Sequence, residues 1–349
     1  MDPEKITVQS LYPLDIPTVA TFELGDWPLQ SGEVLRDARL VYASYGKLAP
    51  NRKNVVLYPT HYTGDHSSNA TMVGTKRVLD PTRYFIVIPN LFGNGVSTSP
   101  SNAHPSQRQD KFPRVSVYDN VKAQYRLLQD LWGIDRLAAV YGWSMGGQQA
   151  YHWAVLFPEM VERLICCCGS ARTSMHNRVF LEGVKAALCA DRLFSPDGPS
   201  PERGLKAFGR VYAGWAYSQA FYREKRYRDL GFDSVEELLQ WWERDHLSWN
   251  AHDLLAMLRT WQYADVSAND QFNGDLRAAL KNIRARTLLL PGNSDLYFHP
   301  RDNHLELAHL HRGRCVEIPS SWGHMAGSPG RGGVDRAFIE RQMKKELNS

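Results

Sequence analysis

Short hydrophobic runs that end at turn residues recur along the chain and alternate with helical patterns. Continuous runs of this kind are typical of strands that are covered on both faces, as in a parallel sheet. They predict strands at residues 54–59, 84–89, 137–141, 161–169, 286–292 and 314–319, and alternation predicts one or two more at Val34–Tyr45. Hydrophobic residues three or four apart predict helices at about 70–79, 117–132, 145–157, 299–310 and from 334. Residues 1 to about 30 show little periodicity, so we expect an irregular arm there.

The pattern changes between residues 173 and 282. Helical spacing dominates in this segment, aromatic and arginine residues are frequent, and no buried strand is evident. The strand pattern resumes afterwards, which favours a helical cap inserted into the core over a separate C-terminal domain. Strands and helices that alternate as they do outside this segment form a doubly wound sheet with right-handed crossovers. We therefore predict a core of residues 1–172 and 283–349, with a mostly parallel sheet, and a helical cap of residues 173–282.

One junction between a predicted strand and a predicted helix carries the peptide Gly142-Trp143-Ser144-Met145-Gly146. In this context, a Gly-x-Ser-x-Gly pattern indicates a nucleophile elbow, a tight turn that lifts the serine hydroxyl above the sheet edge. The glycines on both sides leave room for the backbone to double back. We therefore predict that Ser144 is a catalytic nucleophile. The alternative is an ordinary Gly-Ser turn at the surface.

A nucleophilic serine needs a base to take its proton and an acid to hold that base in the right tautomer. Asp295 and His324 each follow a predicted strand, and the three residues come in the order serine, acid, histidine. Catalytic groups of open α/β sheets gather beyond the carboxyl ends of the strands. We therefore predict Asp295 as the acid and His324 as the base. Asp302 is the alternative acid, but it falls within a predicted helix.

The oxyanion that forms during acyl transfer needs hydrogen-bond donors. The backbone N–H of Met145 is one candidate, because this residue follows the nucleophile. The loop after the strand at 54–59 is expected to supply the second donor, and it reads Thr60-His61-Tyr62-Thr63-Gly64-Asp65. The alternative for this stretch is an ordinary connection between a strand and a helix.

Composition limits the partners that the chain can have. The formal net charge is only +4, and no basic stripe is interleaved with aromatic residues, so we expect no nucleic-acid partner. Although 43% of the residues are hydrophobic, no apolar run approaches the roughly 18 residues of a membrane span. The polar start of the chain also lacks the apolar core of a secretory signal. We therefore expect a cytoplasmic protein without a membrane partner.

The five cysteines do not indicate a metal site. Cys166, Cys167 and Cys168 are consecutive in an apolar run, Cys189 and Cys315 stand apart, and no pair has the spacing of a zinc site. Neighbours in a strand point to opposite faces, so the first three cannot easily bind one ion. We expect buried, reduced thiols and neither metal nor cofactor; a catalytic cysteine is the alternative.

Four short motifs occur in a distinctive order along the chain, at residues 61–65, 142–150, 293–295 and 323–324. In this order they resemble the homoserine O-acetyltransferase-like branch of the α/β-hydrolases, and the likeness runs from about residue 39 to the end. The resemblance implies an α/β-hydrolase fold with a helical cap, through which such proteins usually form homodimers. It also implies that Ser144, Asp295 and His324 are a catalytic triad, with the backbone amide of Tyr62 as the second oxyanion donor.

The chain departs from that branch where the homoserine substrate is recognised. The acetyltransferases have an aspartate after the catalytic histidine, and here that position is Met325. They also have an arginine early in the cap, and here Lys185 aligns with it, which lacks the bidentate fork of a guanidinium. We therefore do not expect homoserine as the substrate. Lys185, Met325 and Trp143 are the predicted substrate-binding residues.

These features predict a serine hydrolase that cleaves an ester, or a thioester or amide, through an acyl-enzyme on Ser144. The predicted partner is thus a small-molecule acyl substrate. One alternative is an acyl-CoA-dependent O-acyltransferase that uses the same triad on an acceptor other than homoserine. Another is a non-hydrolytic ligand-binding or lyase-like scaffold that retains the triad, because a fold alone does not fix a function.

Overall fold

The computed structural model describes residues 15–195 and 200–348, and its centre is one eight-stranded sheet with the order β1-β2-β4-β3-β5-β6-β7-β8. The six strands from β4 to β8 in this order are parallel to one another. At one edge of the sheet, β2 pairs antiparallel with β4, and β1 pairs antiparallel with β2. The predicted, mostly parallel sheet is therefore confirmed. The strands are β1 Thr18–Pro28, β2 Val34–Tyr45, β3 Val55–Leu57, β4 Phe85–Pro89, β5 Ala139–Trp143, β6 Arg163–Cys167, β7 Arg286–Leu290 and β8 Gly313–Cys315.

Strand β1 was not predicted, and the expected irregular arm is wrong for residues 18–28. This strand pairs with β2 along its length, with register shifts on both sides of Gly25. Its residues are exposed or only half-buried, because β1 is an edge strand with one face toward water. A half-buried edge strand with bulges does not produce a continuous apolar run. Residues 1–14 of the predicted arm lie outside the described part of the chain.

The helix expected at about 70–79 is also wrong. A shorter helix, α1, spans His66–Ala70 and begins where the Asp65 carboxylate accepts hydrogen bonds from the backbone amides of Ser67 and Ser68. The chain after α1 forms turns, and Val73 makes an isolated parallel bridge with Leu79. The hydrophobic spacing in this stretch thus comes from a packed loop.

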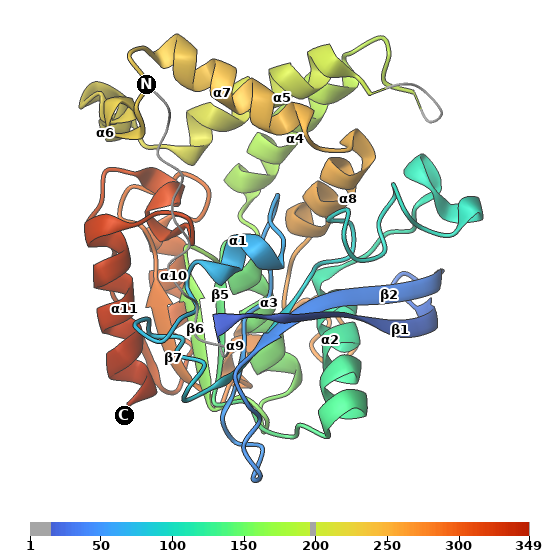
Figure 1. The fold of residues 1–349 in the computed structure, drawn as a ribbon, viewed down its shortest axis with the longest axis vertical. Helices are drawn as coiled ribbons and strands as arrows, with labels where there is room; N and C mark the ends of the chain where they lie inside the picture. Colours follow the sequence, from blue (N-terminus) through green and yellow to red (C-terminus); the bar gives the residue numbers. More distant parts are fainter. Residues whose placement is uncertain (1–14, 196–199, 349) are drawn as a thin grey trace.

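Helices cover both faces of the sheet, as a doubly wound architecture requires (Figure 1). On one face α2 and α3 contribute Leu127 and Trp153 to a hydrophobic cluster with the sheet residues. On the other face α11 contributes Ile339 and Met343 to a second cluster, which continues into the helices above the sheet. The helices of the core are α2 Val117–Trp132, α3 Met145–Leu156, α10 Pro300–Leu307 and α11 Gly333–Leu347.

Residues 173–282, called the cap segment here, lie between β6 and β7 and contribute no strand to the sheet. Helices α4–α8 stand above one end of the sheet, whereas α9 packs beside the core (Figure 1), where Ala279 and Leu280 join the cluster around α2 and α3. The division into core and cap stays a prediction. The helices of the cap segment are α4 Met175–Cys189, α5 Glu202–Ala216, α6 Gln219–Arg223, α7 Val235–Leu247, α8 Ala251–Gln262 and α9 Leu276–Lys281.

The cysteines are all free, but they are not all buried. Cys166, Cys167 and Cys168 are buried, as expected. Cys189 is exposed because it ends α4, and Cys315 is half-buried because it lies on the edge strand β8, so the prediction is wrong for these two. Among the helices that the structure describes, none combines the length and the apolar character that crossing a bilayer requires.

Candidate active site

Ser144 occupies a sharp turn between β5 and α3. Its backbone has φ 58° and ψ −127°, a conformation that costs energy for any residue with a side chain, and its N–H donates to the carbonyl of Cys167 at 2.9 Å. The flanking glycines make this turn possible. A Cβ at Gly142 would stand 1.9 Å from the carbonyl oxygen of Gly146, and a Cβ at Gly146 would stand 2.7 Å from that of Pro59. The Gly-x-Ser-x-Gly pattern is thus a steric requirement of the elbow.

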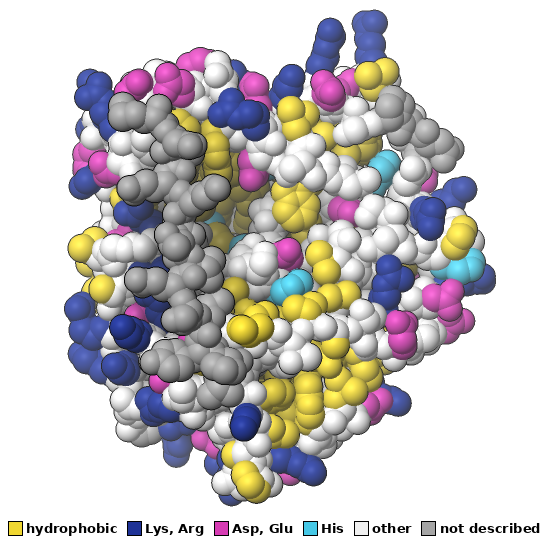
Figure 2. Space-filling view, viewed as in Figure 1, with side chains coloured by type: hydrophobic (Ala, Val, Ile, Leu, Met, Phe, Trp, Pro, Cys, Tyr) yellow, Lys and Arg dark blue, Asp and Glu magenta, His cyan; other side chains and the backbone are white. Residues whose placement is uncertain are grey.

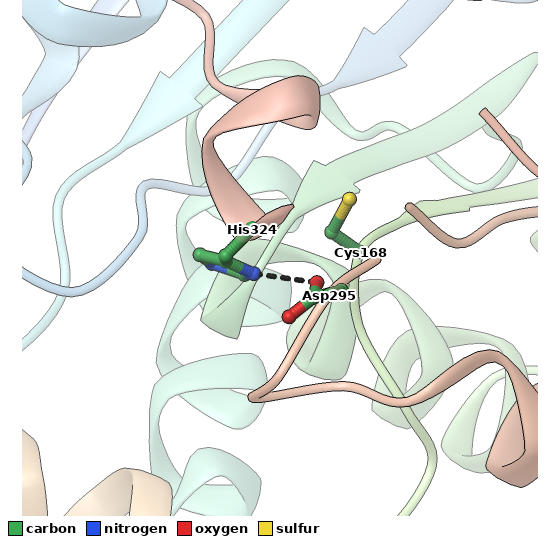
Figure 3. A group of neighbouring side chains, drawn as sticks. All are labelled: Cys168, Asp295 and His324. Atoms are coloured by element: carbon green, nitrogen blue, oxygen red, sulfur yellow. Dashed lines mark hydrogen bonds and ion pairs between the residues drawn. The ribbon is translucent and has the colours of Figure 1, made fainter. Parts of the chain in front are cut away.

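A chain of two hydrogen bonds links Ser144, His324 and Asp295. The Nε2 atom of His324 lies 2.9 Å from the Ser144 hydroxyl. Its Nδ1 atom lies 2.8 Å from the Asp295 carboxylate, a bond that Figure 3 shows. A carboxylate can only accept, so Nδ1 carries the proton and Nε2 accepts from the serine. This is the tautomer that a general base for Ser144 requires. All three side chains are at most 3% exposed, so water does not compete for these bonds.

The Asp295 carboxylate is fixed by its own loop after β7. One oxygen accepts the bond from His324, while the other accepts from the backbone amides of Tyr297 at 2.8 Å and Phe298 at 3.1 Å. Three donors therefore set the orientation of one carboxylate. Asp302, the alternative acid, lies in the first turn of α10 and is only half-buried, so the structure brings Asp295 and not Asp302 to the histidine.

The predicted oxyanion donors lie on two adjoining elements. Met145 is the first residue of α3, and Tyr62 lies in the loop after β3. Neither backbone N–H donates to an acceptor within residues 15–195 or 200–348, so both are available to a ligand. The loop is held in place from below, because the Gln149 amide donates to the carbonyl of Thr60 at 2.7 Å. It is held from above by the Tyr62 hydroxyl, which donates to the carbonyl of Leu254 on α8 at 3.2 Å.

Several residues around the histidine were missed by the sequence analysis. Tyr297 and Phe298 place their rings 4.8 Å and 5.5 Å from the His324 ring. His61 is buried against Trp143, and burial lowers its pKa to about 4. The only available signal was position, since two aromatic residues closely follow the predicted acid and His61 precedes the predicted oxyanion donor.

Cys168 also borders the site, and its sulfur lies within 4.8 Å of ligand atoms of Asp295 and His324 (Figure 3). Such a trio could hold a metal ion if the thiol were ionised. The hydrogen bond with Cys167 and burial raise the pKa of the Cys168 thiol well above its usual value, so it remains protonated and is a poor ligand. The bonds between His324, Asp295 and Ser144 explain the arrangement without an ion.

Comparison with known proteins agrees with this geometry. A sequence profile of the alpha/beta hydrolase fold matches residues 62–195. A probable esterase from Corynebacterium glutamicum is 35% identical, over 87% of this chain and 89% of its own. An ethyl acetate hydrolase from Pseudomonas veronii is 34% identical, over 79% and 80% of the two chains. The crystal structure of an acetylester hydrolase from Corynebacterium glutamicum superposes with a TM-score of 0.90 at 33% identity, covering 95% of this chain and 96% of the other.

The chain belongs to the α/β-hydrolase family. Within this family it falls in the homoserine O-acetyltransferase-like branch, since a homoserine O-acetyltransferase from Bradyrhizobium diazoefficiens is 31% identical over 90% of this chain and 88% of its own. The resemblance drawn from the four sequence motifs is therefore confirmed.

The three predicted substrate-binding residues of this α/β-hydrolase lie at different places. Trp143 is buried and its ring stacks on His324. Met325 follows His324, is half-buried and packs against the cluster that includes the cap helices. Lys185 forms an ion pair with Glu182 on α4. The structure brings Trp143 to His324, and the binding roles of all three stay predictions.

Proposed function

We propose that this protein is a carboxylic ester hydrolase that works through an acyl-enzyme on Ser144. The observation that carries the proposal is the unbroken chain of hydrogen bonds from the Ser144 hydroxyl through His324 to Asp295. A serine at a surface turn would have no reason to meet a buried histidine whose other nitrogen is held by a carboxylate. The esterases among the relatives support the same reaction class.

The geometry supports a two-stage reaction. His324 takes the proton of Ser144 as the hydroxyl attacks the ester carbonyl, and Asp295 stabilises the imidazolium that forms. The negative charge that develops on the carbonyl oxygen is accepted by the amides of Tyr62 and Met145. His324 then gives the proton to the leaving alcohol. Water, deprotonated by the same histidine, finally releases the acid from the acyl-enzyme.

We infer that the substrates are esters of short acyl groups, acetate first. The relatives named as an ethyl acetate hydrolase and an acetylester hydrolase support this inference. The enclosure of the catalytic residues supports it too, because Ser144 and His324 are each only 3% exposed. Figure 2 shows hydrophobic side chains gathered in a hollow between the cap helices and the core, as an ester rather than a charged amino acid would require.

Ser144→Ala tests the proposed nucleophile. We expect the folded variant to lose turnover of acetate esters by several orders of magnitude and to lose labelling by a fluorophosphonate probe. Ser170→Ala is a matched control, because Ser170 is also buried, follows the neighbouring strand β6 and only donates to the carbonyl of Arg172. Normal turnover in Ser144→Ala would contradict the acyl-enzyme route. A wild-type protein that the probe does not label would favour a non-hydrolytic scaffold.

A second candidate function is acyl transfer to an alcohol, with acetyl-CoA as the donor. The homoserine acyltransferases among the relatives support it, and the same residues would carry it out. Incubation with acetyl-CoA and a panel of alcohols separates the two functions. Thiol release that depends on the alcohol would favour transfer, whereas release in water alone would favour hydrolysis.

We further infer a homodimer formed through the cap segment and a cytoplasmic location. The family resemblance supports the dimer, and the free cysteines fit a reducing compartment. Light scattering coupled to gel filtration measures the mass of the particle, for which a value near 80 kDa, twice the 39.7 kDa of the chain, is expected. Cell fractionation tests the location.

A further inference from the structure

We propose that Trp143 is a positioning residue for the catalytic base, whose indole face stabilises the imidazolium form of His324. This proposal rests on the proposed esterase function and adds a residue to its machinery. The indole and imidazole rings stack with their centroids 4.9 Å apart and their planes at 26°. A cation within about 6 Å of the centre of an indole ring is attracted by the negative face of the ring.

Trp143 packs in the hydrophobic core, but hydrogen bonding does not explain why residue 143 is a tryptophan. The indole N–H is buried and finds no acceptor within the described residues, so a hydrogen bond does not select tryptophan here. The residue ends β5 and immediately precedes Ser144, and its ring lies against the histidine that bonds the Ser144 hydroxyl. A phenyl ring or a leucine would fill most of this space. An indole differs from both because its face attracts a cation most strongly.

The other rings around the histidine do not take this position. Tyr297 and His324 lie edge to face, at 4.8 Å and 68°, while Phe298 is tilted at 32° and lies farther away, at 5.5 Å. Only Trp143 among them stacks on the imidazole, with its face against the ring that becomes charged. Of these three rings, Trp143 is therefore the one whose geometry favours the charged form of the base.

A second histidine that packs against the indole is kept neutral. The His61 ring meets Trp143 at 4.5 Å and 67°, and burial together with the nearby His324 lowers the pKa of His61 to about 4. Above about pH 5, His61 is therefore uncharged. A charged His61 would compete for the indole and repel the imidazolium, so its neutrality leaves the stabilisation by the indole to the base.

The test is the pH dependence of ester hydrolysis in Trp143→Met, a variant that fills the space without an aromatic face. If the indole stabilises the imidazolium, its loss makes the charged form of His324 less favourable. The acidic limb of the plot of kcat/KM against pH is then expected to shift to lower pH by about 0.4 to 1.5 pH units. The value of kcat is expected to fall about twofold to thirtyfold with KM nearly unchanged, because the imidazolium forms in the transition state.

Trp143→Phe is the conservative variant, which restores a weaker aromatic face, and it is expected to shift the limb in the same direction by a smaller amount. If Trp143→Met does not fold, the direction of the shift in Trp143→Phe tests the proposal by itself. Trp215→Met is the matched control, because this indole of the cap segment contacts His176 at 5.0 Å and no catalytic residue. Its profile is expected to be unchanged.

The sign of the shift separates positioning from simple packing. If Trp143 only filled space, its removal would admit water, which hydrates the imidazolium and moves the acidic limb upward or leaves it unchanged. Either result in Trp143→Met or Trp143→Phe, with an active wild type, would overturn the proposal and leave the esterase function intact. A wild-type protein that neither hydrolyses acetate esters nor reacts with a fluorophosphonate would overturn the esterase function itself.

Discussion

At the scale of single residues, the environment of Asp295 permits a sharp prediction. One carboxylate oxygen accepts from two backbone amides and the other accepts from His324. In Asp295→Asn the amide oxygen can keep the backbone bonds, but the amide nitrogen then faces His324 and forces its proton onto Nε2. That tautomer cannot take a proton from Ser144, so kcat is expected to fall by roughly 10⁴-fold while the fold is retained.

Steady-state kinetics and thermal unfolding of the same preparation check this prediction. The matched control is Asp302→Asn, because this half-buried residue of α10 was the alternative acid and does not meet the histidine. It is expected to keep wild-type turnover. The reverse ranking of the two variants would show that the assignment of the acid is wrong.

The catalytic candidates were predictable because each follows an apolar run in a fixed order. Ser144 directly follows β5, Asp295 lies in the loop after β7, and His324 lies in a short 3-10 helix, Gly323–Gly327, on the stretch of chain after β8. The rings around His324 were not predictable in the same way. Tyr297 reaches it through a turn whose shape depends on hydrogen bonds to Asp295, and His61 reaches Trp143 through a loop. Local turns of this kind have no periodicity that a pattern of hydrophobic residues could reveal.

At the scale of elements, the elbow requires close contact between β5, α3 and the loop after β3. Gly146→Ala would place a Cβ 2.7 Å from the carbonyl oxygen of Pro59, a backbone atom that cannot move without displacing the loop that carries Tyr62. We expect loss of activity and a lower melting temperature, by several degrees or more. Gly183→Ala is the matched control, since no atom lies within 4 Å of its added Cβ on α4.

Gly183→Ala is expected to stabilise the protein slightly, by about 0.5–1 kcal/mol, because alanine loses less backbone entropy than glycine in a helix. Differential scanning calorimetry and ester hydrolysis of both variants provide the comparison. Equal stability and activity of Gly146→Ala and the wild type would contradict the tight contact at the elbow.

The loop that carries Tyr62 is attached to the cap segment by one side-chain hydrogen bond. The Tyr62 hydroxyl donates to the carbonyl of Leu254, and its ring packs against those of Tyr212 and Trp261. Tyr62→Phe keeps the ring contacts and removes the hydrogen bond. If this bond positions the backbone amide for the oxyanion, kcat is expected to fall by about threefold to tenfold with little change in KM.

Tyr222→Phe is a suitable control for this variant, because its hydroxyl also donates to a backbone carbonyl, that of Ala213, but within the cap segment. It is expected to leave kcat unchanged. Equal kcat values for Tyr62→Phe and the wild type would show that the attachment to α8 does not position the oxyanion donor.

Strands and helices that are buried by packing in the sheet layers were predictable from the sequence. Exposed or very short elements were not predictable. The runs that became β3 to β7 and the spacing that became α2 and α3 are consequences of burial on the sheet. Strand β1 has no fully buried residue within its span, and α1 is a single short helix fixed by its Asp65 cap. Neither depends on a periodic apolar face, so the pattern carried no signal for them.

At the scale of the whole molecule, buried ionisable groups make the stability depend on pH in two opposite ways. Burial lowers the pKa values of His61, His152 and His246 to about 4. Between pH 6.5 and 4, these histidines are therefore protonated in the unfolded chain and neutral in the folded protein. The free energy of unfolding therefore falls as the pH drops through that window. Burial raises the pKa values of Glu306 and Asp253 to about 7 and about 6. For these two groups the free energy of unfolding falls as the pH rises, because the unfolded chain loses the proton first.

Glu306 is the clearest case of the second effect. Its carboxyl group accepts from the Ala171 amide at 2.7 Å, from the Asn303 side chain at 2.9 Å and from the Tyr151 hydroxyl at 2.8 Å, and so joins α10, α3 and the loop after β6. The folded state holds the proton up to about pH 7, whereas the unfolded chain releases it near the ordinary pKa of 4.5 for a glutamate. Between these values the wild type loses stability as the pH rises, by something on the order of 1–3 kcal/mol from this group.

Glu306→Gln removes that ionisation and keeps the shape of the side chain. Relative to the wild type, the variant is expected to be more stable at pH 8 than at pH 5, by the same order of magnitude, in urea unfolding followed by tryptophan fluorescence. Glu23→Gln, a change on the exposed side of β1, controls for the loss of one negative charge and is expected to shift stability equally at both pH values. If Glu306→Gln gave the same pH dependence as Glu23→Gln, the carboxyl group would be charged in the folded protein throughout. The stabilisation of the carboxylate by its three hydrogen-bond donors would then exceed the free-energy cost of burying its charge. The three buried histidines would remain the source of the loss of stability in acid.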